Sequence, residues 1–437
     1  MFIDQIITEI WKPVTKQYKE AYEAAKKLSA EELYERHIAS EMKYFPYIGV
    51  NMNYIDTCGC PYRMAGGQLS GCSMCDYQSE LAKRQGSLLA LREMSPALYA
   101  KAVKQGFINS RGENAKSNVI ENVSGYDSLD HSEVPEELCE ELFREDIFED
   151  APFIYNVEAR ASTVTEERLK SFKKSVANRK RVSIDFGVEV SDEWIRNEWL
   201  NKSVTNAQIQ DAVELLHKNK FKAVGNVLFG VPGLTEEQMI EVFVNSVLWM
   251  DSIGIDKIVI HVLNRKQYTL QGYIYQKLRN DEELLEKGLV QGEHTGLPWV
   301  FSVIRGLEKL YRKKSDIFKK AVVTRVDVNF NSISNKICYN EAEGEESNKY
   351  IDYINGLALN NKYDTLKEMV ETIKQDTAYK AYEALLEKQK KCGSFADTFK
   401  LMGKKLAQCV GGDNWETLYS EFEIPEKFMQ ERGNKNE

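Results

Sequence analysis

The chain of 437 residues lacks several features that would place it in particular classes of protein. No stretch approaches eighteen consecutive apolar residues, so the sequence predicts no membrane span. The first residues include Asp4 and Glu9 and lack a basic start followed by an apolar run, which argues against a signal peptide. The five histidines are dispersed, so we assign no general acid or base and expect His261 to be a satisfied core residue. We therefore expect a cytoplasmic protein.

Clustered positive charge is also scarce. The formal net charge of −9 argues against a general polyanion binder, because phosphate contacts require grouped Lys and Arg. The exception is the basic run 305–325, which contains few acids. A solvated helix face is the favoured interpretation of this run, and a footprint for an anionic substrate stays open.

Cysteine, by contrast, is concentrated. Four of the eight cysteines stand in one segment, Cys58, Cys60, Cys72 and Cys75, with the spacing C-x-C-x11-C-x2-C. In a chain without a secretion signal, thiolates crowded in this way usually hold a metal or an iron–sulfur cluster. The other cysteines are scattered and are expected to be reduced packing residues. They are Cys139, Cys338, Cys392 and Cys409.

Alternating strand and helix patterns predict an α/β fold. Six strand-like segments are separated by segments of helical length, which indicates parallel βαβ units in a sheet or a partial (βα)6 barrel of TIM type. A further strand candidate covers 321–330. We expect a helical extension over 1–46, the partial barrel over 47–275 and an α-rich accessory region for the substrate over 276–437. The six segments are 47–56, 117–124, 152–158, 181–190, 221–231 and 257–263.

The fourth predicted strand has one polar face. Ser183, Asp185, Gly187 and Glu189 alternate with apolar residues, whereas a parallel strand buried between helix layers is apolar on both faces. Glu158 and Arg160 also share one side, and a salt bridge at the strand end is the alternative explanation for them. Asn226 is a polar residue in an otherwise apolar strand. Together these residues favour a cavity lined by the sheet.

The cysteine segment has two possible occupants. Four thiolates fit a structural tetrahedral zinc site, which would make the protein a non-catalytic zinc-binding adaptor. However, structural zinc usually holds together a small fold, and this segment follows the first strand of a large βα region. Loops at the carboxyl ends of strands carry the chemistry of βα barrels. A cluster with three protein thiolates would leave one iron open.

At this point the sequence resembles the radical S-adenosylmethionine (SAM) enzymes. The similarity includes the cysteine loop after the first strand, the Glu in the third strand and the alternating fourth strand. The branch with the elongator catalytic subunit and oxygen-independent coproporphyrinogen oxidase is the most similar. Within the family, the residues of these motifs are most similar to those of the radical SAM subunit of archaeosine synthase. The supporting motifs are Gly71-Cys72-Ser-Met-Cys75-Asp-Tyr77, Gly230-Val-Pro-Gly233-Leu-Thr-Glu-Glu237 and Leu297-Pro298-Trp299-Val300-Phe301-Ser302.

The resemblance implies specific cofactor contacts. Cys60, Cys72 and Cys75 would ligate a [4Fe–4S] cluster, and Cys60 is preferred to Cys58 because a proline follows it. The usual C-x3-C-x2-C spacing is absent, and Cys58 is an extra thiol. The residues implied for SAM are Met74 beside the adenine, Ser124, Gly125 and Tyr126 at the end of strand two, Glu158, Arg160, Glu189 and Asn226 as polar contacts, and Arg196 or Lys202 for the carboxylate.

The resemblance also implies the activity. The cluster would cleave SAM reductively to a 5′-deoxyadenosyl radical that abstracts hydrogen from a substrate. The substrate class stays open between a small molecule, a peptide and tRNA, with an archaeosine-type lyase as one alternative. A reducing donor such as flavodoxin or ferredoxin is implied as a partner.

Overall fold

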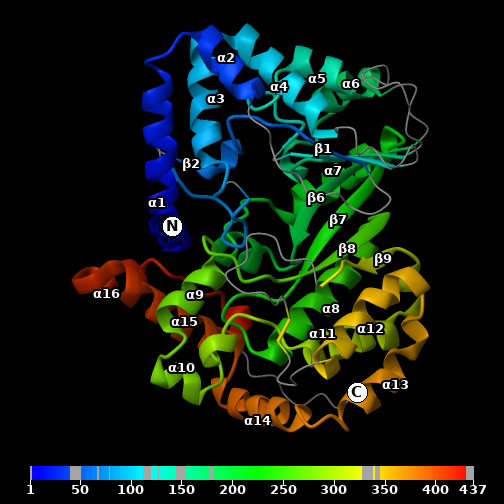
Figure 1. Cartoon of the computed structure of the whole chain (residues 1–437). Coiled ribbons are helices and arrows are strands. Elements are labelled where there is room, and N and C mark those ends of the chain that lie inside the picture. Colours follow the sequence, from blue (N-terminus) through cyan, green and yellow to red (C-terminus); the bar gives the residue numbers. More distant parts are fainter. Residues whose placement is uncertain are drawn as a thin grey trace.

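The computed structural model describes residues 2–39, 51–65, 68–77, 79–111, 120–125, 127–143, 154–176, 181–326, 338–339 and 345–429. Its centre is an open sheet of seven strands, all parallel and ordered as in the chain (Figure 1). Each of the six predicted strands is present, and the candidate at 321–330 adds a seventh at the edge. The strands are β1 (Asn51–Tyr54), β4 (Ile120–Ser124), β5 (Ile154–Glu158), β6 (Arg181–Glu189), β7 (Lys222–Phe229), β8 (Lys257–Val262) and β9 (Ala321–Val323).

The predicted α/β class is therefore confirmed, and the sheet is open, as a partial barrel requires. A short antiparallel hairpin, β2 (Met64–Ala65) with β3 (Gln68–Leu69), interrupts the loop after β1. The predicted domain limits stay a prediction. However, β9 lies beyond position 275 and pairs in parallel with β8, so the later region contributes to the same sheet.

Helices connect the strands and extend both ends of the sheet. Thr165, Thr205 and Thr235 cap the helices that follow β5, β6 and β7, each accepting a backbone N–H with its hydroxyl. The helices up to β8 are α1 (Phe2–Ala25), α2 (Ala30–Ala39), α3 (Ala82–Met94), α4 (Pro96–Arg111), α5 (Glu136–Leu142), α6 (Glu166–Ser175), α7 (Asn206–Lys218) and α8 (Glu236–Ser252).

The chain after β8 is mostly helical, as expected (Figure 1). Within the described ranges, no helix is both long and apolar enough to cross a membrane. These helices are α9 (Leu270–Leu278), α10 (Glu282–Glu286), α11 (Val300–Lys313), α12 (Glu345–Asn360), α13 (Leu366–Ile373), α14 (Tyr379–Gln389), α15 (Phe395–Gly411) and α16 (Trp415–Ser420).

Two hydrophobic cores hold these elements together. The first covers one face of the sheet, where Val157, Ile184 and Ile260 are completely buried against helices that include α4 to α8 and α11. The second joins the ends of the chain, because α1 packs on a π-helical turn, Ile195–Trp199, and on α15. Figure 1 shows α1 beside α3, with α15 near the lower end of α1. The N-terminal helix is thus part of the fold.

We predict that Ile7→Ala destabilises the whole protein. Ile7 is completely buried in the second core, so the truncation leaves a cavity and lowers the free energy of unfolding by about 2–5 kcal/mol. Chemical denaturation of the purified chain measures this change. Lys12→Ala on the exposed face of the same helix is the control, with an expected change within about 0.5 kcal/mol. Equal stability of both variants would show that α1 packs only loosely.

Candidate functional site

The four grouped cysteines lie on the loop between β1 and α3, at the carboxyl end of the sheet. The predicted position of this loop is therefore confirmed. The backbone N–H of Cys75 donates to the carbonyl of Cys72 at 3.2 Å, so this C-x-x-C pair shares one turn. Gly71 enters the turn with a φ of 105°, which a residue with a side chain rarely adopts.

Cys58 differs from its neighbours in its contacts. Its Sγ accepts from Nη1 of Arg92 at 3.5 Å and from the hydroxyl of Tyr99 at 3.8 Å, so helices α3 and α4 engage this thiol. Burial raises the pKa of Cys60 to about 12; the negative charges of Glu133 and Cys72 add to this, while Arg160 opposes it. Cys60 is therefore close enough to Cys72 to feel its charge, and the choice of Cys60 rather than Cys58 as the third ligand stays a prediction.

Cationic groups surround the cysteine loop. Nη2 of Arg63 donates to the carbonyl of Cys75 at 2.8 Å, and its buried Nη1 has no hydrogen-bond partner among the described residues. The Arg63 guanidinium lies 3.9 Å from the centre of the Trp11 ring. Burial alone would lower the pKa of Arg160, but the nearby sulfurs of Cys72 and Cys60 favour its charged form and the pKa is raised.

This donor set fits an iron–sulfur cluster in its chemistry. Soft thiolates are the usual ligands of such clusters, and an unsatisfied buried Arg63 N–H next to the loop suits an anionic group. Burial favours the protonated form of the Cys60 thiol in the free chain, and metal binding would displace that proton. Within the described ranges, no three His, Cys, Asp or Glu side chains are yet gathered closely enough to hold a metal. Binding would therefore have to draw the cysteines together.

Strands β4 and β5 end beside this loop in a hydrogen-bonded group. The hydroxyl of Ser124 donates to Oε2 of Glu158 at 2.9 Å, and the backbone N–H of Gly125 donates to the same oxygen at 3.3 Å. The Tyr77 hydroxyl lies 3.3 Å from Oγ of Ser124. Burial raises the pKa of Glu158 to about 7, and the charge of Asp185 raises it further. Tyr126 lies outside the described residues.

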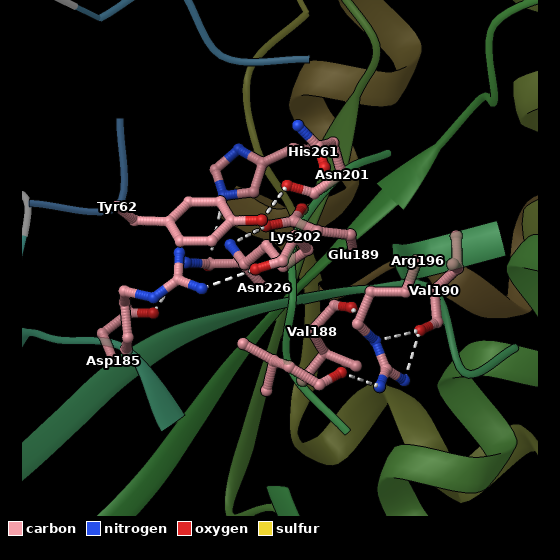
Figure 2. Close-up of polar contacts among 12 residues, drawn as sticks. Tyr62, Asp185, Val188, Glu189, Val190, Arg196, Asn201, Lys202, Asn226 and His261 are labelled. Atoms are coloured by element: carbon pink, nitrogen blue, oxygen red, sulfur yellow. Dashed lines mark hydrogen bonds and ion pairs between the residues drawn. The ribbon is translucent and has the colours of Figure 1, made fainter. Parts of the chain in front are cut away.

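The end of β6 carries an ion pair held by an unusual backbone. Nζ of Lys202 donates to Oε1 of Glu189 at 2.7 Å, and the pair contacts the bulge at which β6 shifts register against β7 (Figure 2). Glu189 has a φ of 63°. A Cβ on Gly187 would lie 2.1 Å from Oε1 of Glu189 and 2.3 Å from Nζ of Lys202. A side chain at 187 would therefore displace the ends of Glu189 and Lys202 from their present positions.

A row of polar side chains continues across β5 to β8. Nδ2 of Asn226 donates to Oδ1 of Asp185 at 2.7 Å, and Nδ2 of Asn156 lies 3.5 Å from Oδ2. Nε2 of His261 lies 3.2 Å from Oδ1 of Asn226, so His261 is hydrogen-bonded as expected, although it is only half-buried. Burial raises the pKa of Asp185 to about 6, while the amides of Asn156 and Asn226 stabilise its charge. The predicted polar face of β6 is thus confirmed (Figure 2).

Arg196 was expected to bind the carboxylate of SAM, but in the structure it binds the backbone of its own loop. Its guanidinium is completely buried and donates to the carbonyls of Val188 and Val190 at 2.7–3.1 Å (Figure 2). It also donates to the carbonyl of Val204 at 3.0 Å and to Oδ1 of Asn206 at 2.6 Å. Backbone oxygens already occupy most of its donors, so the structure offers no support for contact between Arg196 and a ligand carboxylate, and this contact stays a prediction. Of the two expected cations, Lys202 is the better placed for that role because it lies at the polar end of β6.

Three other expectations can be placed. Met74 is half-buried and packs against the second core, so its contact with adenine stays a prediction. Within the described residues no ion pair joins Glu158 to Arg160; instead, the Arg160 guanidinium donates to the carbonyl of Lys202. Three cations of the basic run form ion pairs. Arg305 pairs with Glu237, and Lys314 and Lys320 both pair with Asp251.

No role for Tyr62 or Asn201 was predicted from the sequence. The Tyr62 hydroxyl donates to the carbonyl of Asn201 at 2.8 Å, and the Arg160 guanidinium lies 4.2 Å from the centre of the Tyr62 ring. Both residues are far apart in the sequence and have no motif of their own. A weak signal exists only for Asn201, because Asn is one of the few residues that tolerate a left-handed backbone, and its φ is 51°.

Comparison with known proteins finds matches among solved structures. No family model and no curated protein match the chain. A structure of the radical SAM methyltransferase TsrM from Kitasatospora setae, with cobalamin and a [4Fe-4S] cluster bound, is 16% identical with a TM-score of 0.32 and covers 52% of this chain. A second, with tryptophan and the SAM analog aza-SAM, is 16% identical with a TM-score of 0.29 and covers 48%. The matches span only 37% and 35% of the TsrM chain. Similarity this low does not establish the function of this chain.

We predict that Glu158 makes stability depend on pH. The folded carboxyl keeps its proton up to about pH 7, whereas the unfolded one loses it near pH 4.5, so the folded state loses stability as the pH rises between these values. Glu158→Gln removes this loss, and its melting temperature should fall less than that of the wild type between pH 5 and pH 7.5. The exposed variant Glu416→Gln should follow the wild type. Parallel curves for Glu158→Gln and wild type would show an ordinary pKa.

Proposed function

We propose that this protein is a radical SAM enzyme. One observation carries the proposal: three cysteines lie on the loop that leaves the first strand, beside a polar edge of a parallel sheet, while the fourth is engaged elsewhere. Cys60, Cys72 and Cys75 would hold a [4Fe–4S] cluster. The contacts of Cys58 with Arg92 and Tyr99 support its exclusion from this set. The more specific similarity to archaeosine synthase rests on motif wording alone and stays a prediction.

When bound, the cluster would supply the electron that cleaves SAM into methionine and the hydrogen-abstracting 5′-deoxyadenosyl group. The residues of this chain would bind and orient SAM. Ser124 and Gly125 hold Glu158 at the end of β4, where its carboxylate suits the amino group of SAM. Lys202 suits the carboxylate of SAM, since its ammonium sits between Glu189 and the cysteine loop. Met74, Tyr126, Arg160, Glu189 and Asn226 complete the proposed contacts.

The substrate is proposed to be small rather than a nucleic acid. Three of the cations in 305–325 pair with Glu237 and Asp251, which weakens a tRNA footprint there. The half-buried polar row around Asp185 and Asn226 supports recognition of a compact polar group. A peptide that inserts one side chain would meet the same requirement. A flavodoxin or ferredoxin is the proposed source of electrons.

We predict that anaerobic reconstitution loads a cluster that depends on three of the four cysteines. The wild type should contain about four irons, absorb near ~400 nm and release 5′-deoxyadenosine from SAM after reduction. Ala substitution of Cys60, Cys72 or Cys75 should abolish the cluster, because each removes a thiolate ligand. Iron and sulfide analysis, absorption spectra and chromatography of the nucleoside provide the measurements.

Cys58→Ala is the matched control, and it should keep both the iron and the activity. Loss of the cluster in Cys58→Ala but not in Cys60→Ala would contradict the assignment of ligands. A colourless protein that contains one zinc would contradict the proposed function and favour the zinc-binding adaptor.

A further inference from the structure

The segment that follows β6 has an unusual backbone. Asn201 and Ser203 have φ values of 51° and 53°, and Glu189 at the end of β6 has a φ of 63°. A π-helical turn, Ile195–Trp199, lies between these positions. Left-handed non-glycine residues and π-turns are both uncommon, and they persist where surrounding contacts impose them. Contacts with the rest of the fold must therefore hold residues 199–203 in place.

Hydrogen bonds join this segment to both halves of the cysteine loop. The backbone N–H of Ser73 donates to the carbonyl of Leu200 at 2.8 Å, and its hydroxyl donates to the carbonyl of Trp199 at 3.0 Å. Nδ2 of Asn201 donates to the carbonyl of Gly71 at 2.8 Å. From the first half of the loop, the Tyr62 hydroxyl donates to the carbonyl of Asn201 at 2.8 Å. The residue before Cys72 and the one after it are thus fixed to the same segment.

Asn201 is the central residue of this junction. It is 3% exposed, and its amide also donates to Oδ1 of Asp4 on α1 at 3.2 Å. The next residue is Lys202, which pairs with Glu189 and whose carbonyl accepts from Arg160. The charge of Cys72 is one of the interactions that raise the pKa of Lys202. Asn201 therefore connects the cysteine loop, α1 and Lys202.

We infer that Asn201 is a positioning residue that fixes the cysteine loop against Lys202. Its side-chain amide holds the loop at Gly71, and its left-handed backbone turns Lys202 toward Glu189 (Figure 2). Under the proposed function, on which this consequence rests, Asn201 couples the cluster to the carboxylate site of SAM without touching either ligand. Binding at one of the two sites should then strengthen binding at the other.

The inference predicts that Asn201→Gly weakens the binding of SAM through Lys202. Glycine keeps the left-handed backbone and removes the amide, so the dissociation constant of SAM for the reconstituted protein should rise roughly tenfold. Asn201→Asp keeps the shape but turns an oxygen toward the Gly71 carbonyl and Asp4, so its effect should be at least as large. Asn361→Gly and Asn361→Asp are matched controls, since Asn361 has a φ of 50° but is exposed. Titrations followed by the electron paramagnetic resonance of the reduced cluster give the constants.

A double-mutant cycle separates positioning from a general loss of stability. If Asn201 acts through Lys202, Asn201→Gly should change the affinity for SAM less than about twofold when Lys202→Met is already present. A merely structural role would lower the melting temperature and leave the affinity of the folded protein unchanged. Effects that multiply in the double variant, or wild-type affinity in Asn201→Gly, would overturn the inference.

A measurement without cofactors keeps this inference independent of the proposed function. In the metal-free chain, Cys72 is buried and should react slowly with iodoacetamide, whereas Cys409 is exposed and serves as the internal reference. Asn201→Gly should accelerate the labelling of Cys72 relative to Cys409 by at least about threefold, because the released loop opens more often. Unchanged labelling would overturn the inference even if the wild type binds SAM. Faster labelling of Cys72 in Asn201→Gly, together with a wild type that takes up no cluster, would overturn only the proposed function.

Discussion

One geometric constraint determines the rest of the structure: parallel strands that follow one another in chain order all end at the same edge. The loop after β1, the ends of β4 and β5 and the bulge of β6 therefore meet, although long stretches of sequence separate them. Helices cover the apolar face of the sheet, so its other face is free to carry polar groups. The cysteine loop and Glu158 lie together because of this topology rather than because of any local motif.

Buried charge is the main cost of this arrangement. Glu158, Asp185 and Glu189 are all carboxyl groups at the same end of the sheet, and Lys202 pairs with one of them. Burial raises the pKa values of Glu158 and Asp185, and the amides of Asn156 and Asn226 offset part of that cost for Asp185. Such groups are stabilised further when a ligand of opposite charge arrives, which is typical of a binding site rather than of a structural core.

The strands and the polar face of β6 could be predicted from the sequence. The contacts of Arg196 and Asn201 could not, because they depend on how distant segments fold together. Alternation in β6 predicted its polar face, because this signal depends only on neighbouring residues. Arg196 looked equivalent to Lys202 as a free cation. Its burial among carbonyls depends on how the loop after β6 folds back, which composition does not reveal. Asn201 contacts residues 130 and 197 positions away, and no short pattern encodes such contacts.

The bond between Gly71 and Asn201 also bears on how the protein is made. At about 5–20 residues per second, a ribosome needs roughly 6–26 seconds to synthesise the 130 residues that separate these partners. During that interval the cysteines have left the ribosome, but the segment that fixes them does not yet exist. The thiols are then open to oxygen and to stray metal ions. A metal ion that binds during synthesis would therefore meet a loop not yet held by Asn201, whereas one that binds afterwards would meet a loop already held in place.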